Sequence, residues 1–217
     1  MKEITLTELY EIMYDNMRPS GWWPGRSNWE IIWSTVLIQN ANWKNASKAS
    51  ESLYRATKSM PETILTLPDE ELEKVIASAG FYTRKAKTIK NIAQYFIEKY
   101  NCNLELAQTQ DKGKLRKEIL SIHGVGSETA DVILMYGLEK GEFVVDKYAR
   151  RLFSCLGWDD VPPYEKAKRL IEANLDNFTL RNYQNFHAMI DEFNIQYKLP
   201  TQFDETFLKE YQLIIPQ

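Results

Sequence analysis

Apolar residues recur along most of this 217-residue chain at spacings of three and four, the pattern of one buried face of an α-helix. No stretch alternates apolar and polar residues for long enough to indicate a sheet. Proline and glycine separate the helical stretches. The pattern predicts an all-α chain, with a short helix beginning at Pro61 and longer helices over 6–17, 29–38, 43–56, 69–79, 85–100, 112–122, 127–138, 146–156, 164–174 and 180–197.

Two of the predicted helices are joined by the segment Gly124-Val125-Gly126. The two glycines permit a tight reversal that side chains would obstruct, so the chain forms a helix, a hairpin turn and a second helix. Backbone N–H groups exposed at such a turn can hold a phosphate. The second helix begins at Ser127, and the hydroxyl of Ser127 or Thr129 suits a hydrogen bond in its first turn. A glycine pair also occurs in ordinary turns, so the neighbouring residues are needed to distinguish a phosphate-binding hairpin from an ordinary turn.

Asp146 follows three apolar residues, Phe143-Val144-Val145, and lies at the start of a predicted helix. A carboxylate beside a deoxyribose stabilises the positive charge that develops as an N-glycosidic bond breaks, and it can orient the attacking water. An aspartate before a helix also serves as an N-cap. Two interpretations therefore stay open, a catalytic acid or a cap alone. Lys147 and Arg151 are placed to contact a phosphate or to support the acid.

The hairpin segment 122–130, taken with Val144-Val145-Asp146, resembles the helix-hairpin-helix DNA glycosylase superfamily, which has the endonuclease III-like fold. Two further segments are similar to family segments and follow in the same order, namely Leu37-Ile38-Gln39-Asn40 and 80–87. The resemblance implies a cleft between two helical lobes. One is a helical barrel lobe over 25–137 with the helix-hairpin-helix motif at 112–138, and the other combines 1–24 with 138–217 and carries the catalytic acid.

Two departures narrow the resemblance. Members that also cleave the DNA strand carry a lysine nucleophile where this chain has Glu128, and a carboxylate cannot form an imine. Endonuclease III has a four-cysteine iron–sulfur loop, whereas this chain has only Cys102 and Cys155, so no iron–sulfur cofactor is expected. The 3-methyladenine DNA glycosylase III group is the branch that the chain resembles most, through Trp22-Trp23-Pro24, Trp43, Asp146-Lys147-Tyr148, Phe186-His187 and Glu192-Phe193.

That resemblance implies residue roles. The pocket for an extruded base is formed by Trp22, Trp23, Pro24 and Trp43, and the DNA-binding residues are Gln39, Phe81, His123, Gly124, Val125, Gly126, Ser127 and Lys147. Gln39 fills the gap left by the extruded base, and Phe81 wedges into the partner strand. The residues themselves leave alternatives: Gln39 as a helix-end residue, Phe81 as a core residue, and the tryptophans as packing. A monovalent cation held by the hairpin carbonyls is a further implication.

The net charge of −3 argues against a protein that grips long stretches of nucleic acid, but its distribution is uneven. Residues 80–151 hold 13 basic and 9 acidic residues, and the segments on either side are both acidic. This local excess suits a small footprint on double-stranded DNA. The alternative is that the basic run in 84–90, Arg84, Lys85, Lys87 and Lys90, only solvates a helix face.

Composition excludes other classes. No apolar run is long enough for a membrane span, and the first twenty residues do not read as a secretory signal. Two distant cysteines indicate reduced thiols, so a cytoplasmic protein working with the chromosome is expected. Neither His123 nor His187 is accompanied by other metal ligands, so no catalytic metal is expected. Nothing in the sequence indicates more than a monomer.

The expected function is therefore that of a monofunctional DNA glycosylase of base excision repair. A purine methylated at N3 or N7 is already cationic and leaves readily, and a cation stacks well on tryptophan, which favours alkylated purines such as 3-methyladenine. Two alternatives stay open. The chain acts on another damaged or mismatched base, or it is a helix-hairpin-helix DNA-binding protein without catalysis.

Overall fold

A computed structural model of the chain describes residues 1–19 and 23–214. The chain divides into two compact units: unit 1 is Met1–Trp23 with Gly141–Gln217, and unit 2 is Pro24–Lys140. Both are built mainly of α-helices, which confirms the predicted all-α class. Compared with the expected lobes, Pro24 and residues 138–140 fall in unit 2.

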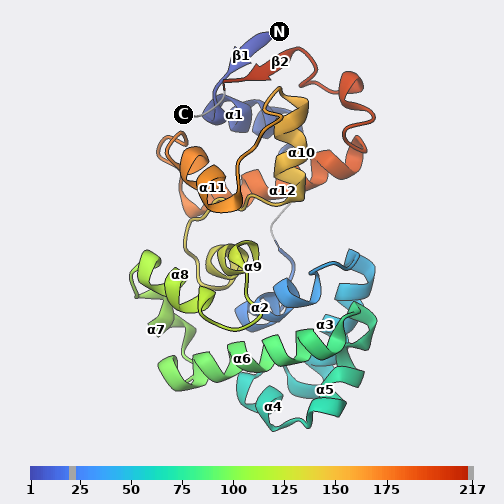
Figure 1. Ribbon diagram of the computed structural model, residues 1–217, viewed down its shortest axis with the longest axis vertical. Helices are drawn as coiled ribbons and strands as arrows, with labels where there is room; N and C mark the ends of the chain where they lie inside the picture. The colour runs from blue at the N-terminus through green and yellow to red at the C-terminus, as the bar shows by residue number, and fades with distance from the viewer. Residues whose placement is uncertain (20–22, 215–217) are drawn as a thin grey trace. The chain divides into compact units, whose positions relative to one another are not determined.

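Unit 2 is a group of helices packed around α2. Its elements are α2 Asn28–Leu37, α3 Trp43–Thr57, α4 Pro61–Thr66, α5 Asp69–Ile76, the 3-10 turn Ala77–Ala79, α6 Tyr82–Tyr100, α7 Leu104–Gln108, α8 Lys112–Leu120, α9 Ser127–Val132 and the π-helical turn Ile133–Gly137 (Figure 1). Nearly every residue of α2 is buried. Trp29 and Trp33 stack with ring centroids 5.6 Å apart, and the Trp33 indole N–H donates to the Ser59 carbonyl at 2.9 Å. These two tryptophans therefore belong to the core, as their helical spacing predicts.

Unit 1 joins the two ends of the chain. It contains β1 Lys2–Ile4, α1 Leu6–Met17, α10 Lys147–Cys155, α11 Tyr164–Glu172, α12 Leu180–Gln196, the 3-10 turn Phe203–Glu205 and β2 Tyr211–Leu213 (Figure 1). β1 and β2 pair in parallel, with Lys2 opposite Tyr211 and Ile4 opposite Leu213. The core of this unit is rich in aromatic rings, among them Phe186, which is fully buried.

Local signals explain why the elements begin where they do. Thr5 and Glu8 form a capping box at the start of α1, and each supplies a hydrogen bond that the first turn lacks. α12 begins in the same way at Thr179 and Asn182. None of the described helices has the length and apolar character needed to cross a membrane.

Candidate functional site

The hairpin between α8 and α9 is held rigidly in unit 2. Arg116 Nε donates to Asp131 Oδ1 at 2.7 Å, and this carboxylate is fully buried. Gly124 has φ +96°, and a Cβ built there would lie 2.0 Å from Thr88 Oγ1 of α6. The chain therefore needs glycine at 124 both for its backbone conformation and for the close approach of α6.

Gly126 differs from Gly124. It is the N-cap of α9 with extended backbone, and a Cβ at this position would meet nothing within 4 Å. Packing inside the chain therefore does not require glycine here. Gly126 therefore leaves open space beside the residue that precedes α9, and the N-terminus of a helix favours an anion.

The remaining hairpin residues have different environments. The Val125 side chain belongs to the core of unit 2, so only its backbone is available to a ligand. His123 is exposed, and its carbonyl oxygen accepts a hydrogen bond from Asn91 Nδ2 at 3.0 Å. Ser127 is the first residue of α9 and is half-buried, and Glu128 beside it is exposed.

A cavity of about 470 Å³ lies beside the hairpin, and four of the residues predicted to bind DNA line it. The full lining is Gln39, Asn40, Phe81, Arg84, Lys85, Lys87, Thr88, His123 and Gly124. Arg84 and Lys87 are exposed, and none of the lining residues is acidic. The cavity therefore has a positive field that suits a phosphate backbone. Sequence reasoning missed Asn40 as a member of this surface.

Phe81 is not a core residue, which was one of the two predicted alternatives. Its side chain is 64% exposed at the start of α6. Its backbone is left-handed, with φ +47°, which is uncommon for a bulky residue.

Gln39 follows the C-cap of α2, and its Nε2 donates to Thr129 Oγ1 of α9 at 2.7 Å. Gln39 thus has a structural partner in unit 2 while it lines the cavity.

The four cations of residues 84–90 do not form one solvated face. Lys85 is buried, and its ammonium donates to the carbonyls of Leu37 and Ala79, each at 2.8 Å. Burial lowers the pKa of Lys85. The alternative that the basic run only solvates a helix face is wrong for Lys85, because its ammonium joins α2 to the turn before α6.

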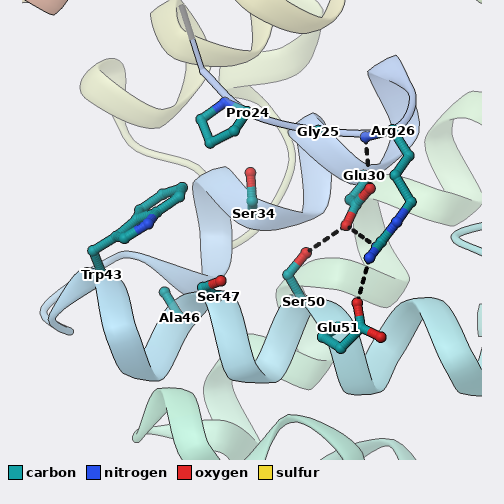
Figure 2. A pocket seen from close by; sticks show the side chains of 10 residues that line it. All are labelled: Pro24, Gly25, Arg26, Glu30, Ser34, Trp43, Ala46, Ser47, Ser50 and Glu51. Carbon is teal, nitrogen blue, oxygen red and sulfur yellow. Dashed lines mark hydrogen bonds and ion pairs between the residues drawn. The ribbon is translucent and has the colours of Figure 1, made fainter.

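A second cavity of unit 2, about 260 Å³ in volume, contains two of the residues predicted for the base pocket, Pro24 and Trp43. In Figure 2, Trp43, at the start of α3, and Pro24 lie at the left of the cavity lining, and Arg26, Glu30 and Glu51 lie at the right. Trp43 is 46% exposed, which leaves a large part of its surface for a ligand. Trp22, also predicted for this pocket, lies outside the described residues.

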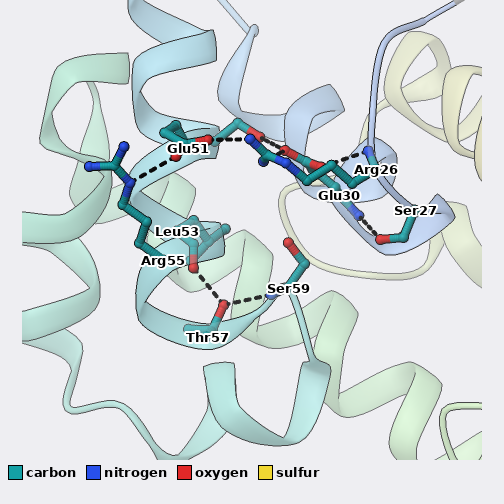
Figure 3. Close-up of polar contacts among 9 residues, drawn as sticks. Arg26, Ser27, Glu30, Glu51, Leu53, Arg55, Thr57 and Ser59 are labelled. Carbon is teal, nitrogen blue, oxygen red and sulfur yellow. Dashed lines mark hydrogen bonds and ion pairs between the residues drawn. The ribbon is translucent and has the colours of Figure 1, made fainter.

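The far wall of this cavity is a network of charges. The buried carboxylate of Glu30 accepts hydrogen bonds from the Arg26 backbone N–H at 2.7 Å and from Arg26 Nη1 at 2.8 Å (Figure 2). Arg26 also pairs with Glu51, which accepts from Arg55 Nε at 2.8 Å (Figure 3). Hydrogen bonds from Arg26 and then Arg55 lower the pKa of Glu51. The lining holds two carboxylates and one guanidinium.

Asp146 lies in unit 1, where it is the N-cap of α10. Its Oδ1 accepts hydrogen bonds from the backbone N–H groups of Tyr148 at 3.1 Å and Ala149 at 2.8 Å. The side chain is buried, with 9% of the residue exposed. Both cap bonds use Oδ1, which leaves Oδ2 outside the cap. Asp146 is therefore a cap, and the cap fixes a carboxylate whose second oxygen is available for other work.

Lys147, the first residue of α10, is exposed, and its ammonium lies 4.8 Å from the centre of the Tyr148 ring. Arg151 lies on the same ring, with its guanidinium 5.6 Å from the ring centre. Two cations of α10 therefore lie on the ring of Tyr148, two residues after Asp146.

His187 was not predicted as a site residue, yet it lies beside the acid. One of its ring nitrogens and one carboxylate oxygen each from Asp146 and Asp191 lie within 4.8 Å of one another. The same ring stacks on Trp23, a residue predicted for the base pocket, with ring centroids 6.4 Å apart and planes 11° from parallel. The expectation that His187 is not accompanied by other metal ligands is therefore wrong, because the fold places Asp146 and Asp191 beside it.

The sequence and the fold are similar to those of known DNA repair proteins. The profile of the HhH-GPD superfamily of base excision DNA repair proteins matches residues 33–177. A protein named only provisionally as a DNA repair glycosylase, from Methanocaldococcus jannaschii, is 38% identical over 187 residues, which cover 85% of this chain and 84% of that protein. Endonuclease III of Sulfolobus acidocaldarius is 31% identical over 169 residues, with 76% and 71% covered.

Among solved structures, the fold is similar to that of the H. pylori 3-methyladenine DNA glycosylase bound to 1,N6-ethenoadenine. The TM-score is 0.75 and the sequence identity is 25%, over 89% of this chain and 98% of that one.

Proposed function

Because the chain belongs to the HhH-GPD superfamily of base excision DNA repair proteins, we propose that it is a monofunctional DNA glycosylase that removes alkylated purines such as 3-methyladenine from double-stranded DNA. The observation that carries the proposal is Asp146, a buried carboxylate with one oxygen fixed by two backbone N–H groups and the other outside that cap.

Unit 2 supplies the proposed grip on DNA. The space in front of α9 at Gly126 takes a phosphate, and Arg84 and Lys87 add positive charge at the neighbouring cavity. Phe81 projects from the same surface and is suited to enter a base step, since it is exposed and aromatic. A footprint of this size needs few phosphate contacts, so it is compatible with a net charge of −3.

Unit 1 supplies the proposed acid. As the bond between C1′ and the base nitrogen breaks, the base leaves with the electron pair and positive charge develops on the sugar. Asp146 stabilises that charge as a carboxylate and orients a water molecule. The water oxygen then adds to C1′, and its proton passes to solvent or to the departing base. The chain's own part is the fixed orientation of the carboxylate, which costs no reorganisation during the reaction.

The proposed base specificity rests on the cavity beside Trp43. An aromatic face binds a cationic base more strongly than a neutral one, by about 0.5–2 kcal/mol. The two carboxylates and one guanidinium of the lining leave one net negative charge, which acts in the same direction. Relatives named endonuclease III keep a second candidate open, a glycosylase for a different damaged base.

We expect neither strand cleavage nor an iron–sulfur cluster. Glu128 stands where strand-cleaving members have the imine-forming lysine, so borohydride should trap no covalent adduct with the substrate. A four-iron cluster needs four thiolates, whereas the chain has two cysteines, Cys102 in unit 2 and Cys155 in unit 1. The residues do not fit the cluster. A monovalent cation at the hairpin and a monomeric state stay predictions.

The test is excision from a panel of duplexes, each with a single lesion: 3-methyladenine, 7-methylguanine, an oxidised pyrimidine, or adenine opposite a mispaired base. We expect release of the methylated purines. Release of the oxidised pyrimidine alone would support the second candidate, and release of none would overturn the enzymatic proposal.

The matched variant is Asp146→Asn, because asparagine caps a helix about as well as aspartate and should leave stability nearly unchanged. We expect it to bind an abasic duplex as the wild type does and to excise at least a hundredfold more slowly. Excision at the wild-type rate would refute the role of Asp146.

A further inference from the structure

We infer that His187 is a positioning residue for the reaction, and that it acts by holding the carboxylate of Asp146 beside a second acid, Asp191. The inference deepens the proposed function and rests on Asp146 being its acid. It comes from unit 1 alone, where α10 and α12 pack together (Figure 1).

Three residues at helical spacing on α12 face the start of α10. His187 and Asp191 place a ring nitrogen and a carboxylate oxygen within 4.8 Å of each other and of an Asp146 oxygen. One turn further on, Asn194 Nδ2 donates to the Tyr148 carbonyl of α10 at 3.1 Å and to the Ile190 carbonyl at 2.9 Å. The amide of Asn194 thus fixes α12 against the helix that Asp146 caps.

The cluster has a charge problem that His187 is suited to solve. Asp146 is buried and Asp191 is half-buried, and a carboxylate oxygen of each lies within 4.8 Å of the other, a separation at which two negative charges repel. A ring nitrogen that carries a proton donates to one carboxylate, directly or through a water molecule, and reduces this repulsion. The proposed reaction needs Asp146 ionised.

The face of the His187 ring stacks on a residue predicted for the base pocket. His187 is only 9% exposed, and its ring lies parallel to that of Trp23. Packing against Trp23 restricts the ring to a plane, and thereby sets where its nitrogens lie. His187 therefore stacks on a predicted base-pocket residue and has a ring nitrogen within 4.8 Å of an oxygen of the predicted acid.

The deciding variant is His187→Phe, which keeps a flat ring against Trp23 and removes both nitrogens. We expect the single-turnover rate of excision to fall about ten- to a hundredfold, the loss typical when a side chain that orients a functional group is removed. Affinity for an abasic duplex should change less than twofold, because the proposed loss is in the reaction step.

The second variant separates positioning from mere packing. Asp191→Asn introduced into His187→Phe removes the like charge, so the double variant should excise several times faster than His187→Phe. A packing role predicts no such recovery. If His187→Phe melts at a lower temperature, His187→Asn, which keeps a side-chain N–H, is compared with it below both melting temperatures and should be the faster enzyme.

The result that overturns the inference is His187→Phe excising at the wild-type rate, or a double variant no faster than His187→Phe. Either result counts against the inference when the wild type excises the damaged base and Asp146→Asn does not. A wild type without excision on any lesion would instead be a failure of the proposed function.

Discussion

The two glycines of the hairpin should respond to the same substitution in opposite ways. Gly124→Ala forces a side chain into left-handed backbone, which costs about 1–2 kcal/mol, and places Cβ 2.0 Å from Thr88 Oγ1. Overpacking of this kind costs roughly 1–3 kcal/mol. The reduced freedom of the unfolded chain returns about 0.4–1 kcal/mol. The net expectation is a loss of about 2–4 kcal/mol in the free energy of unfolding.

Gly126→Ala has none of these steric costs, because its Cβ meets nothing within 4 Å and its φ of −95° is ordinary. The loss is expected in DNA binding, since the methyl group occupies the space in front of α9. One displaced charge-assisted hydrogen bond to a phosphate is worth about 1.5–3 kcal/mol, which is tenfold or more in affinity. Gly113→Ala, in the exposed first turn of α8, is the control for both.

Calorimetry and fluorescence anisotropy with a short abasic duplex measure the two effects separately. For a chain of this size, 2–4 kcal/mol corresponds to a fall in melting temperature of roughly 4–16 °C for Gly124→Ala, whereas Gly126→Ala and Gly113→Ala should melt within about 2 °C of the wild type. A Gly126→Ala protein that binds DNA with unchanged affinity would refute the phosphate role of the hairpin. An unchanged melting temperature for Gly124→Ala would refute the close approach of α6.

Three further outcomes are expected. Phe81→Ala should leave the melting temperature unchanged, because the ring is exposed, and should slow excision from a duplex more than from a single strand; an equal effect on both would exclude a wedge. Burial raises the pKa of Cys102 to about 12, whereas the thiol of the unfolded chain has a pKa of ~8.5. The protonated, buried thiol therefore stabilises the fold fully below pH ~8.5, and this stabilisation is lost as the pH rises toward 12. Denaturant unfolding from pH 8 to 11 should therefore show a shallower decline in Cys102→Ala, and identical slopes would contradict the shift. Excision should continue in EDTA, and loss that a divalent cation reverses would make Asp146, His187 and Asp191 a metal site.

Much of the fold follows from local pattern. The apolar spacing predicts a helix over 6–17, and α1 lies there. Its first turn is closed by Thr5 and Glu8, which are three residues apart in the sequence. One helix and one pair of strands were missed for physical reasons. α7 has five residues, too few to show a period. The β1–β2 pair joins segments about 200 residues apart, and neither strand of three residues carries an alternation that could be recognised.

The geometry of the candidate site could be predicted only where it depends on residues adjacent in the sequence. The glycine hairpin and the position of Asp146 at the start of α10 are such cases. Lys85 shows the limit, because whether a lysine meets water or two carbonyls depends on where α2 ends. His187 and Asp191 are a plain i, i+4 pair in sequence, and nothing local says that α10 lies opposite them.

Asp146 also shows why capping and catalysis need not be alternatives. The sequence posed them as competing interpretations, yet a carboxylate has two oxygens, and two backbone N–H groups fix only Oδ1. A catalytic carboxylate on a free rotor would lose entropy each time it met the sugar, whereas one held by the helix it caps is oriented before the substrate arrives. In the proposed role of Asp146, the cap fixes the direction of its carboxylate. This is why Asp146→Asn, which keeps the cap and loses the charge, separates the two roles, and why Asp146→Ala would confound them.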